Sequence, residues 1–174
     1  PDGGPMTHRH TFTVKEQVMP VGAGVTQRRL TFNGQVPGPV LRGKVGDTFE
    51  ITLVNDGTMS HSLDFHAGIT PPDKAMRSIN PGESLVYTFK AQHSGIWLYH
   101  CSTSPMSLHL AAGMHGAVII DPPGLPAVDR EYAIVASEVY LGPEGGEPNT
   151  DKIAAKTPDL MTFNGVAFQY HQQP

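Results

Sequence analysis

The chain has 174 residues, of which 39% are hydrophobic, with 12 basic and 16 acidic side chains and a formal net charge of −4. This length suits one domain of about 100–150 residues with a remainder, or two very small domains. The acidic balance argues against nucleic acid as the main partner, because phosphate binding requires a basic face, and no apolar run approaches the ~18 residues that span a bilayer.

Short stretches of alternating apolar residues recur along the chain and predict half-buried strands. They lie at Phe12 and Val14, at Leu30 and Phe32, at Phe49, Ile51 and Leu53, and at Leu85, Tyr87 and Phe89. Further strands are expected over 96–101, 116–121, 131–139 and 160–163. Helical signals are limited to short turns near 71–77 and 104–112. Short strands separated by Gly, Pro and Asn turns indicate an all-β antiparallel sandwich or barrel.

One tetrapeptide is repeated: Thr-Phe-Asn-Gly occurs at 31–34 and again at 162–165. The second copy follows a long Pro- and Gly-rich connection, and its offset of about one domain length favours the opening of a second, similar domain. A final strand that completes a single sandwich is the alternative. The predicted organisation is a flexible N-terminus at 1–9, a first domain over 10–125, a linker with a connecting strand over 126–159, and the first strand of a second domain over 160–174.

The single cysteine excludes an intrachain disulfide and any all-thiolate metal site, whereas nine histidines and seven methionines are available. Four potential ligands are His61, Cys101, His109 and Met114. A soft thiolate, two imidazoles and a weak thioether are the ligand set of a blue copper electron-transfer site. Cys101, His109 and Met114 lie within 14 residues, so one strand end and the loop after it supply three ligands. His61, from a distant strand, closes the fourth side.

Strand alternation predicts a second site, because neighbouring side chains on a strand point to opposite faces. If Cys101 points into the sandwich, His100 points out of it. His61 and His66 also face opposite ways, while Asp64 shares the face of His66. We therefore expect one buried copper and, on the other face, an exposed pair of imidazoles beside a carboxylate. A catalytic metal generally has three protein ligands, so a third is expected from another subunit or a second domain.

These motifs resemble the first cupredoxin domain of copper-containing nitrite reductases and two-domain multicopper oxidases. The resemblance covers about residues 10–170. It is carried by HSLDFH at 61–66, HC at 100–101, PM at 105–106, the run from His109 to Met114, TFNG-x-VPGP at 31–39 and NPGES at 80–84. It implies a cupredoxin-like Greek-key β-sandwich, with the start of a second cupredoxin domain at the C-terminus.

The resemblance also implies a homotrimer with two kinds of copper centre. Type 1 copper would be held by His61, Cys101, His109 and Met114, and a type 2 or trinuclear copper at the subunit interface by His66 and His100. Asp64 matches the family's carboxylate that hydrogen-bonds substrate and relays protons. An external electron donor and a small oxidant, nitrite or dioxygen, are the implied partners. The family is exported to the periplasm or the cell exterior, although no signal peptide is visible in the chain.

The expected function is that of a copper oxidoreductase that passes electrons from type 1 copper to the interface copper. Ser102 follows Cys101 where multicopper oxidases usually carry a second histidine, and this favours a mononuclear type 2 site. Leu108 stands where nitrite reductases usually have a tryptophan associated with donor docking. The alternative function is a stand-alone blue-copper electron carrier without catalysis, which has no use for the second cluster. His115, next to Met114, is expected at the surface.

Overall fold

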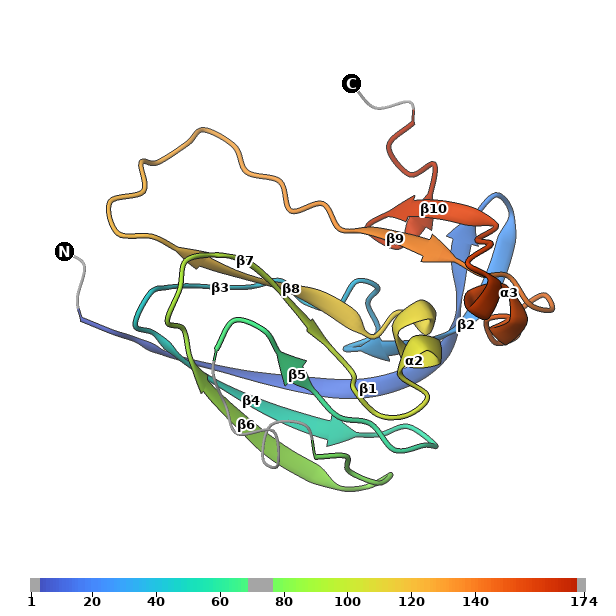
Figure 1. Ribbon diagram of the computed structural model, residues 1–174, viewed down its shortest axis with the longest axis horizontal. Coiled ribbons are helices and arrows are strands. Elements are labelled where there is room, and N and C mark those ends of the chain that lie inside the picture. The colour runs from blue at the N-terminus through green and yellow to red at the C-terminus, as the bar shows by residue number, and fades with distance from the viewer. Residues whose placement is uncertain (1–3, 69–76, 172–174) are drawn as a thin grey trace.

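The computed structural model describes residues 4–68 and 77–171, and strands dominate it (Figure 1). The strands are β1 (Thr7–Gly22), β2 (Val25–Phe32), β3 (Leu41–Lys44), β4 (Thr48–Asn55), β5 (Asp64–Phe65), β6 (Ser84–Lys90), β7 (Gly95–His100), β8 (His115–Asp121), β9 (Ala136–Val139), β10 (Leu160–Phe163) and β11 (Val166–Ala167). Two short helices are α2 (Met106–Ala112) and α3 (Thr150–Ala155). Among the described residues, no helix has both the length and the apolar character needed to cross a membrane.

Two four-stranded sheets form the sandwich, in the orders β2-β1-β4-β6 and β3-β8-β7-β5. β1 runs parallel to β4 and β3 runs parallel to β8, while the remaining neighbours within these sheets are antiparallel. A third, small sheet of β11-β10-β9 lies beside the sandwich, near α3 (Figure 1). The all-β sandwich that the alternating residues predict is confirmed.

The core between the sheets is aromatic, and Tyr99 of β7 lies at its centre. The Tyr99 ring packs against Phe12, Phe32 and Phe65, with ring centroids 5.3–5.8 Å apart. Its hydroxyl donates to the Pro39 carbonyl at 2.6 Å, which satisfies the only polar atom of a fully buried side chain. This anchor fixes the end of β7 immediately before the His100-Cys101 pair.

The structure differs from the sequence-based elements at several places. The strand predicted over 131–139 is confined to β9, and the short turn near 104–112 is the helix α2. Most of the turn predicted near 71–77 lies outside the described residues. Four short elements, β3, β5, β11 and α3, were not predicted, because segments of two to six residues are too short to show a period.

The segment predicted to be flexible at 1–9 is partly ordered, because β1 begins at Thr7. The buried carboxylate of Asp47 holds this end of the strand. It accepts hydrogen bonds from the backbone N–H of Met6 at 2.9 Å and of Lys44 at 2.9 Å, and it contacts His8 Nε2 at 2.7 Å. The His8 ring also stacks on Phe49. A strand end that looks polar in sequence is therefore tied to the sandwich by one side chain.

The repeated tetrapeptide folds the same way in both copies. Asn33 exchanges hydrogen bonds with the backbone of Thr13, which donates its N–H to Asn33 Oδ1 at 2.7 Å and accepts the Asn33 N–H at 2.8 Å. Asn164 makes the same pair of bonds with Val135, at 2.9 and 2.8 Å. Both asparagines and the glycines after them have positive φ, as an Asn-Gly turn between antiparallel strands requires. The copies therefore share local structure as well as sequence.

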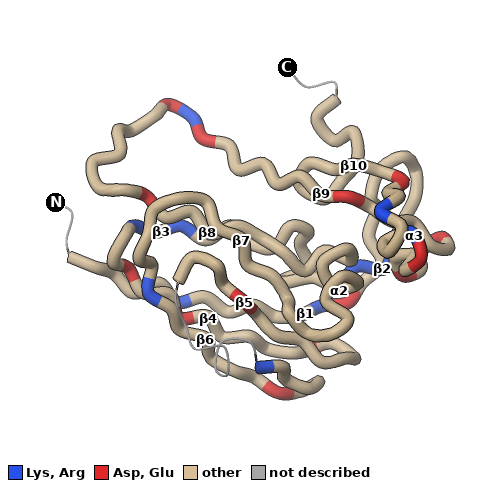
Figure 2. Tube along the Cα trace, in the orientation of Figure 1, with Lys and Arg blue, Asp and Glu red and all other residues tan. Residues whose placement is uncertain are grey.

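Charged residues are dispersed over the surface, with acidic and basic side chains interspersed (Figure 2). One cluster joins the sandwich to the long segment after β8. There Arg42 of β3 forms ion pairs with Asp121, at 2.9 Å, and with Glu131. Because these side chains are partly exposed, the pairs add little stability and mainly orient the connection.

Replacing Asp47 tests the anchoring of β1. Burial raises the pKa of this carboxyl, but the bonds from Met6, His8 and Lys44 outweigh it and hold the pKa well below its usual value. The stabilisation is therefore complete above about pH 4, the ordinary value for aspartate, and is lost as the pH falls further. Asp47→Asn should lower the free energy of unfolding by about 2 kcal/mol at pH 7.

Urea denaturation at pH 7 and at pH 3 measures this loss, with Asp56→Asn at an exposed position as the control. The difference between wild type and Asp47→Asn should shrink at pH 3. An equal difference at the two pH values would contradict the role assigned to the ionised carboxylate.

Candidate metal centres

Three of the four residues predicted to bind type 1 copper meet in the interior at one end of the sandwich. Cys101 Sγ lies 3.2 Å from His109 Nδ1 and 3.9 Å from His61 Nδ1, and the two imidazole rings have centroids 4.9 Å apart. All three side chains are buried. Their ligand atoms lie within 4.8 Å of one another, which is the spacing of atoms that can share one metal ion.

The segment after β7 brings His109 and Met114 to Cys101. Pro105 stands at the N-cap of α2, the seven-residue helix that carries His109. Gly113 ends the helix with a φ of 125°, a conformation that favours glycine. The chain then turns back, so that the Met114 N–H bonds to the His109 carbonyl at 3.1 Å and the Cys101 N–H bonds to the Met114 carbonyl at 3.1 Å. The Met114 side chain is fully buried.

His61 was predicted to come from a strand, but it lies in the loop between β4 and β5, where backbone hydrogen bonds fix it. It exchanges hydrogen bonds with Ile79, at 3.1 and 2.8 Å. Asn55, buried at the end of β4, donates its side-chain amide to the carbonyls of Met59 and Ile79 and accepts the Gly57 N–H. One buried amide therefore ties together the loop that carries His61.

The donor chemistry of this group fits copper. Burial, together with a smaller effect from the charge of His61, lowers the pKa of His109 to about 4, although the charge of Glu16 opposes the change. Burial also lowers the pKa of His61, although the nearby Glu16 opposes that change. Both imidazoles are therefore neutral at pH 7 and keep a lone pair for a metal. The two imidazoles and the Cys101 thiol, together with the buried thioether of Met114, form a set of nitrogen and soft sulfur donors that suits copper.

The second predicted cluster also forms. β5 pairs with β7 so that Asp64 lies opposite His100, and the pairing continues as the His66 N–H bonds to the Leu98 carbonyl at 2.9 Å. His66 Nε2 and His100 Nε2 are 3.1 Å apart, and Asp64 Oδ2 lies 3.3 and 3.5 Å from them. Alternation at the end of β7 thus puts His100 and Cys101 in different clusters, as predicted, whereas His61 reaches the first cluster from a loop.

The two imidazoles of the second cluster differ in exposure. His66 has a side chain 44% exposed, whereas that of His100 is only 9% exposed, so the expected exposed pair has one exposed member. His100 Nδ1 lies 2.9 Å from the Cys101 carbonyl, and since a carbonyl only accepts, Nδ1 carries the proton. The Nε2 atom, which faces His66, therefore carries the lone pair in the neutral ring and could bind a metal.

Glu16 was not predicted as a site residue, yet it contacts the first cluster. Its side chain is 3% exposed and lies 3.4 Å from His61 Nε2. Burial raises the pKa of Glu16, but hydrogen bonds from Thr58 and His61 outweigh it, and the pKa lies below its usual value. A signal was available, because the alternation of Phe12 and Val14 continues inward to Glu16.

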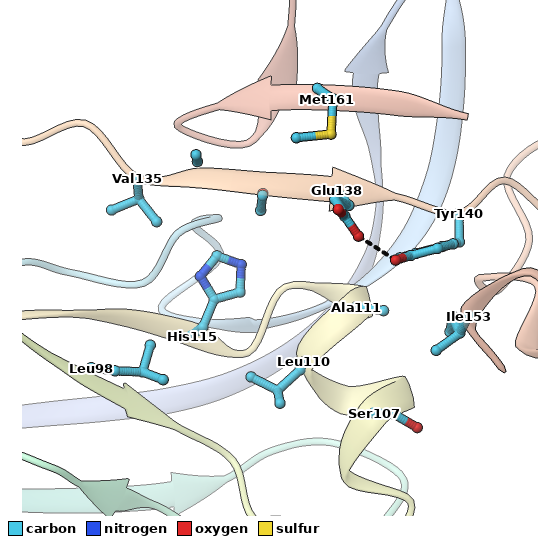
Figure 3. Close-up of a pocket in the computed structure, with 12 residues that line it drawn as sticks. Leu98, Ser107, Leu110, Ala111, His115, Val135, Glu138, Tyr140, Ile153 and Met161 are labelled. Carbon is cyan, nitrogen blue, oxygen red and sulfur yellow. Dashed lines mark hydrogen bonds between the residues drawn. The ribbon is translucent and has the colours of Figure 1, made fainter. Parts of the chain in front are cut away.

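His115 was predicted to lie at the surface, but the structure shows that it is buried. Burial, together with the charges of Arg29 and His100, lowers the pKa of His115 to about 4. The ring points toward β9 and lines an open, mainly apolar cavity of about 490 Å³ between α2, β8 and β9 (Figure 3). Residues of β9, in the segment after β8, face His115 across this cavity. The lining residues of this cavity belong to neither metal cluster.

Sequence comparisons identify relatives of this chain. Residues 13–124 match the family model for multicopper oxidases. The chain is 37% identical to the copper-containing nitrite reductase of Neisseria gonorrhoeae, over 86% of this chain and 41% of that protein. It is 35% identical to the copper-containing nitrite reductase of Alcaligenes xylosoxydans xylosoxydans, over 94% of this chain and 58% of that protein.

Solved structures of proteins with the same names superpose on this chain. A copper nitrite reductase from Nitrosomonas europaea superposes with a TM-score of 0.87 at 39% identity, covering 94% of this chain and 58% of that one. A multicopper oxidase gives a TM-score of 0.80 at 27% identity, covering 94% and 56%. The chain spans less than two thirds of the length of each of these proteins. The chain belongs to the multicopper oxidase family, and its sandwich is the cupredoxin domain of the copper nitrite reductases and multicopper oxidases.

Proposed function

We propose that this chain is the electron-transferring domain of a copper nitrite reductase, with type 1 copper at one cluster and type 2 copper at the other. The observation that carries the proposal is the adjacency of Cys101 and His100. Their side chains belong to different clusters, and the covalent path between the clusters runs through two neighbouring residues. An electron that enters at the buried thiolate therefore has a short bonded route to the half-exposed cluster.

In this proposal His61, Cys101, His109 and Met114 hold the type 1 copper, and His66 and His100 contribute to the type 2 site. Copper bound there would supply one-electron transfer. The protein would contribute rigidity, because the loop at Asn55 and the turn at Gly113 are held by internal hydrogen bonds. Ligands that do not rearrange keep electron transfer fast.

Asp64 is proposed to act on nitrite. Its Oδ2 atom lies within 3.5 Å of the Nε2 atoms of both imidazoles, so it can hydrogen-bond a small anion held there. Nitrite reduction consumes one electron and two protons and yields nitric oxide and water. Asp64 would deliver one proton to the leaving oxygen as a general acid, and solvent would supply the other. The electron would come from an external one-electron donor.

A homotrimer would complete the second cluster. Two imidazoles are fewer than the three protein ligands that catalytic metal sites generally have. Ile96 and Leu98, which share the outer face of β7 with His100, are 78% and 42% exposed. These two exposed apolar side chains lie next to a metal site that lacks one ligand. Their exposure supports contact with a neighbouring subunit, which would supply the third ligand. Relatives named as copper nitrite reductases further support nitrite as the oxidant. An exported location is proposed from the family resemblance alone.

We also propose that the small sheet opens a second cupredoxin-like domain. β9 pairs with β10 as β1 pairs with β2, and the Asn-Gly turn is bonded in the same way in both places. This assigns the connecting strand β9 to the second unit rather than to the linker. Exposed apolar side chains lie on this sheet, at Met161 (59%) and Phe163 (55%), and directly after it, at Phe168 (68%). Such a surface suits burial by further strands.

Replacing the thiolate tests the type 1 assignment. Copper-loaded wild type should show an intense visible thiolate-to-copper band, and Cys101→Ser should abolish it because a hydroxyl is neither soft nor readily ionised. Visible absorption and electron paramagnetic resonance measure the change. His100→Ala is the matched control, since it leaves all four type 1 ligands in place and should keep the band. Wild type that binds copper without such a band would contradict the assignment.

Replacing residues of the second cluster tests catalysis. His100→Ala should reduce copper per chain from two to one, while Asp64→Asn should keep both and lower nitrite turnover about 10²-fold. Metal analysis and a nitrite assay with a chemical reductant measure these effects, with Asp56→Asn as the exposed control. Oxidation of a phenol in air without nitrite turnover would instead indicate an oxidase. One copper per chain and no turnover in wild type would indicate the electron carrier.

A further inference from the structure

Glu16 of β1 has a buried carboxylate that lies beside the first cluster. Oε1 accepts the Thr58 N–H at 2.9 Å and lies 3.4 Å from His61 Nε2. Oε2 accepts the Thr58 hydroxyl at 2.6 Å and an Arg28 N–H at 3.3 Å. A side chain on Gly57 would overlap Oε1, so the loop requires glycine there for this approach. Loop and strand are therefore shaped around the carboxylate.

The carboxylate determines which nitrogen of His61 carries the proton. An ionised carboxylate can only accept hydrogen bonds, so the Nε2 atom that faces it carries the hydrogen. In neutral imidazole the other nitrogen then has a free lone pair, and Nδ1 is the atom that faces Cys101 Sγ at 3.9 Å. Carboxylates behind metal-binding histidines orient the ring and increase its basicity in this way.

We propose that Glu16 is a positioning residue that holds His61 for the metal and lowers the reduction potential of the type 1 copper. This inference depends on the proposed function, because it requires copper at His61 and Cys101. A buried negative charge behind a ligand favours the more highly charged, oxidised metal ion. Arg28, with a side chain 38% exposed, lies on the far side of the carboxylate and partly offsets its charge. The pair would thus act in opposite directions on the same potential.

Redox titration of the copper-loaded full chain, followed by its thiolate-to-copper band, tests the proposal. Glu16→Gln keeps the size and an acceptor oxygen but removes the charge. It should shift the equilibrium toward reduced copper about tenfold, which is about 59 mV upward for one electron. Arg28→Gln should move the potential downward. If the two substitutions acted only by loosening the packing, they would not be expected to shift the reduction potential in opposite directions. Glu83→Gln removes a charge at an exposed position and should leave the potential unchanged.

The outcomes separate this inference from the proposed function. Wild type without the thiolate-to-copper band would refute the proposed function itself. Wild type with the band, together with a Glu16→Gln potential that is unchanged or lower, would overturn the role of Glu16. If Glu16→Gln does not fold or bind copper, Arg28→Gln decides the question. A lower potential in that variant supports the proposal, and an unchanged or higher one overturns it.

Discussion

Adjacent side chains on a strand point to opposite faces of its sheet, and at the end of β7 this rule separates two kinds of chemistry. Cys101 points into the sandwich, where His61 and His109 meet it, while His100 points outward to His66 and Asp64. No other pair of neighbouring residues in the described chain joins the two groups. The rest of the structure holds this one strand end in place, since any slip of register would exchange the two faces.

Register at β7 is maintained by packing and by hydrogen bonds on both sides of the strand. The Tyr99 ring fills the space between the sheets, and a side chain at Gly116 of the neighbouring strand would overlap it. Beyond the strand, the hydroxyl of Ser62 bonds to the Ser102 N–H at 3.1 Å and to the Thr103 hydroxyl at 2.9 Å. The loop of His61 and the loop after Cys101 are therefore linked directly. Ligands from distant parts of the chain reach one point because these loops cannot move independently.

The two clusters differ in solvation, and the difference matches their proposed roles. The first is dry, so its imidazoles are neutral and its donors are fixed before any metal binds. The second has one exposed imidazole and a partly exposed carboxylate, so a small anion and protons can reach it. Under the proposed function, burial would shield the electron-transfer centre from solvent, and exposure would leave the second centre open to nitrite and protons.

Much of this organisation could be predicted from the sequence because it depends on short-range rules. Alternation predicted the main strands, the spacing from Cys101 to Met114 predicted one ligand group, and strand parity sorted Asp64 and His66 to the other. These rules need only the direction of successive side chains. The Asn-Gly repeat likewise identified two turns of the same kind, because the backbone conformation is set by those two residues.

Other features depend on contacts between distant segments, and only the tertiary structure decided them. Asp47 orders the start of β1, Glu16 lies behind His61, and residues of β9 face the buried His115. Each involves residues that are far apart in the chain or in an irregular segment, where no periodic pattern records the partner. A sequence by itself determines which way a side chain points from its strand. Which groups that side chain then contacts depends on how the strands and loops pack. The charged residues around the two candidate metal sites were therefore decided by the fold.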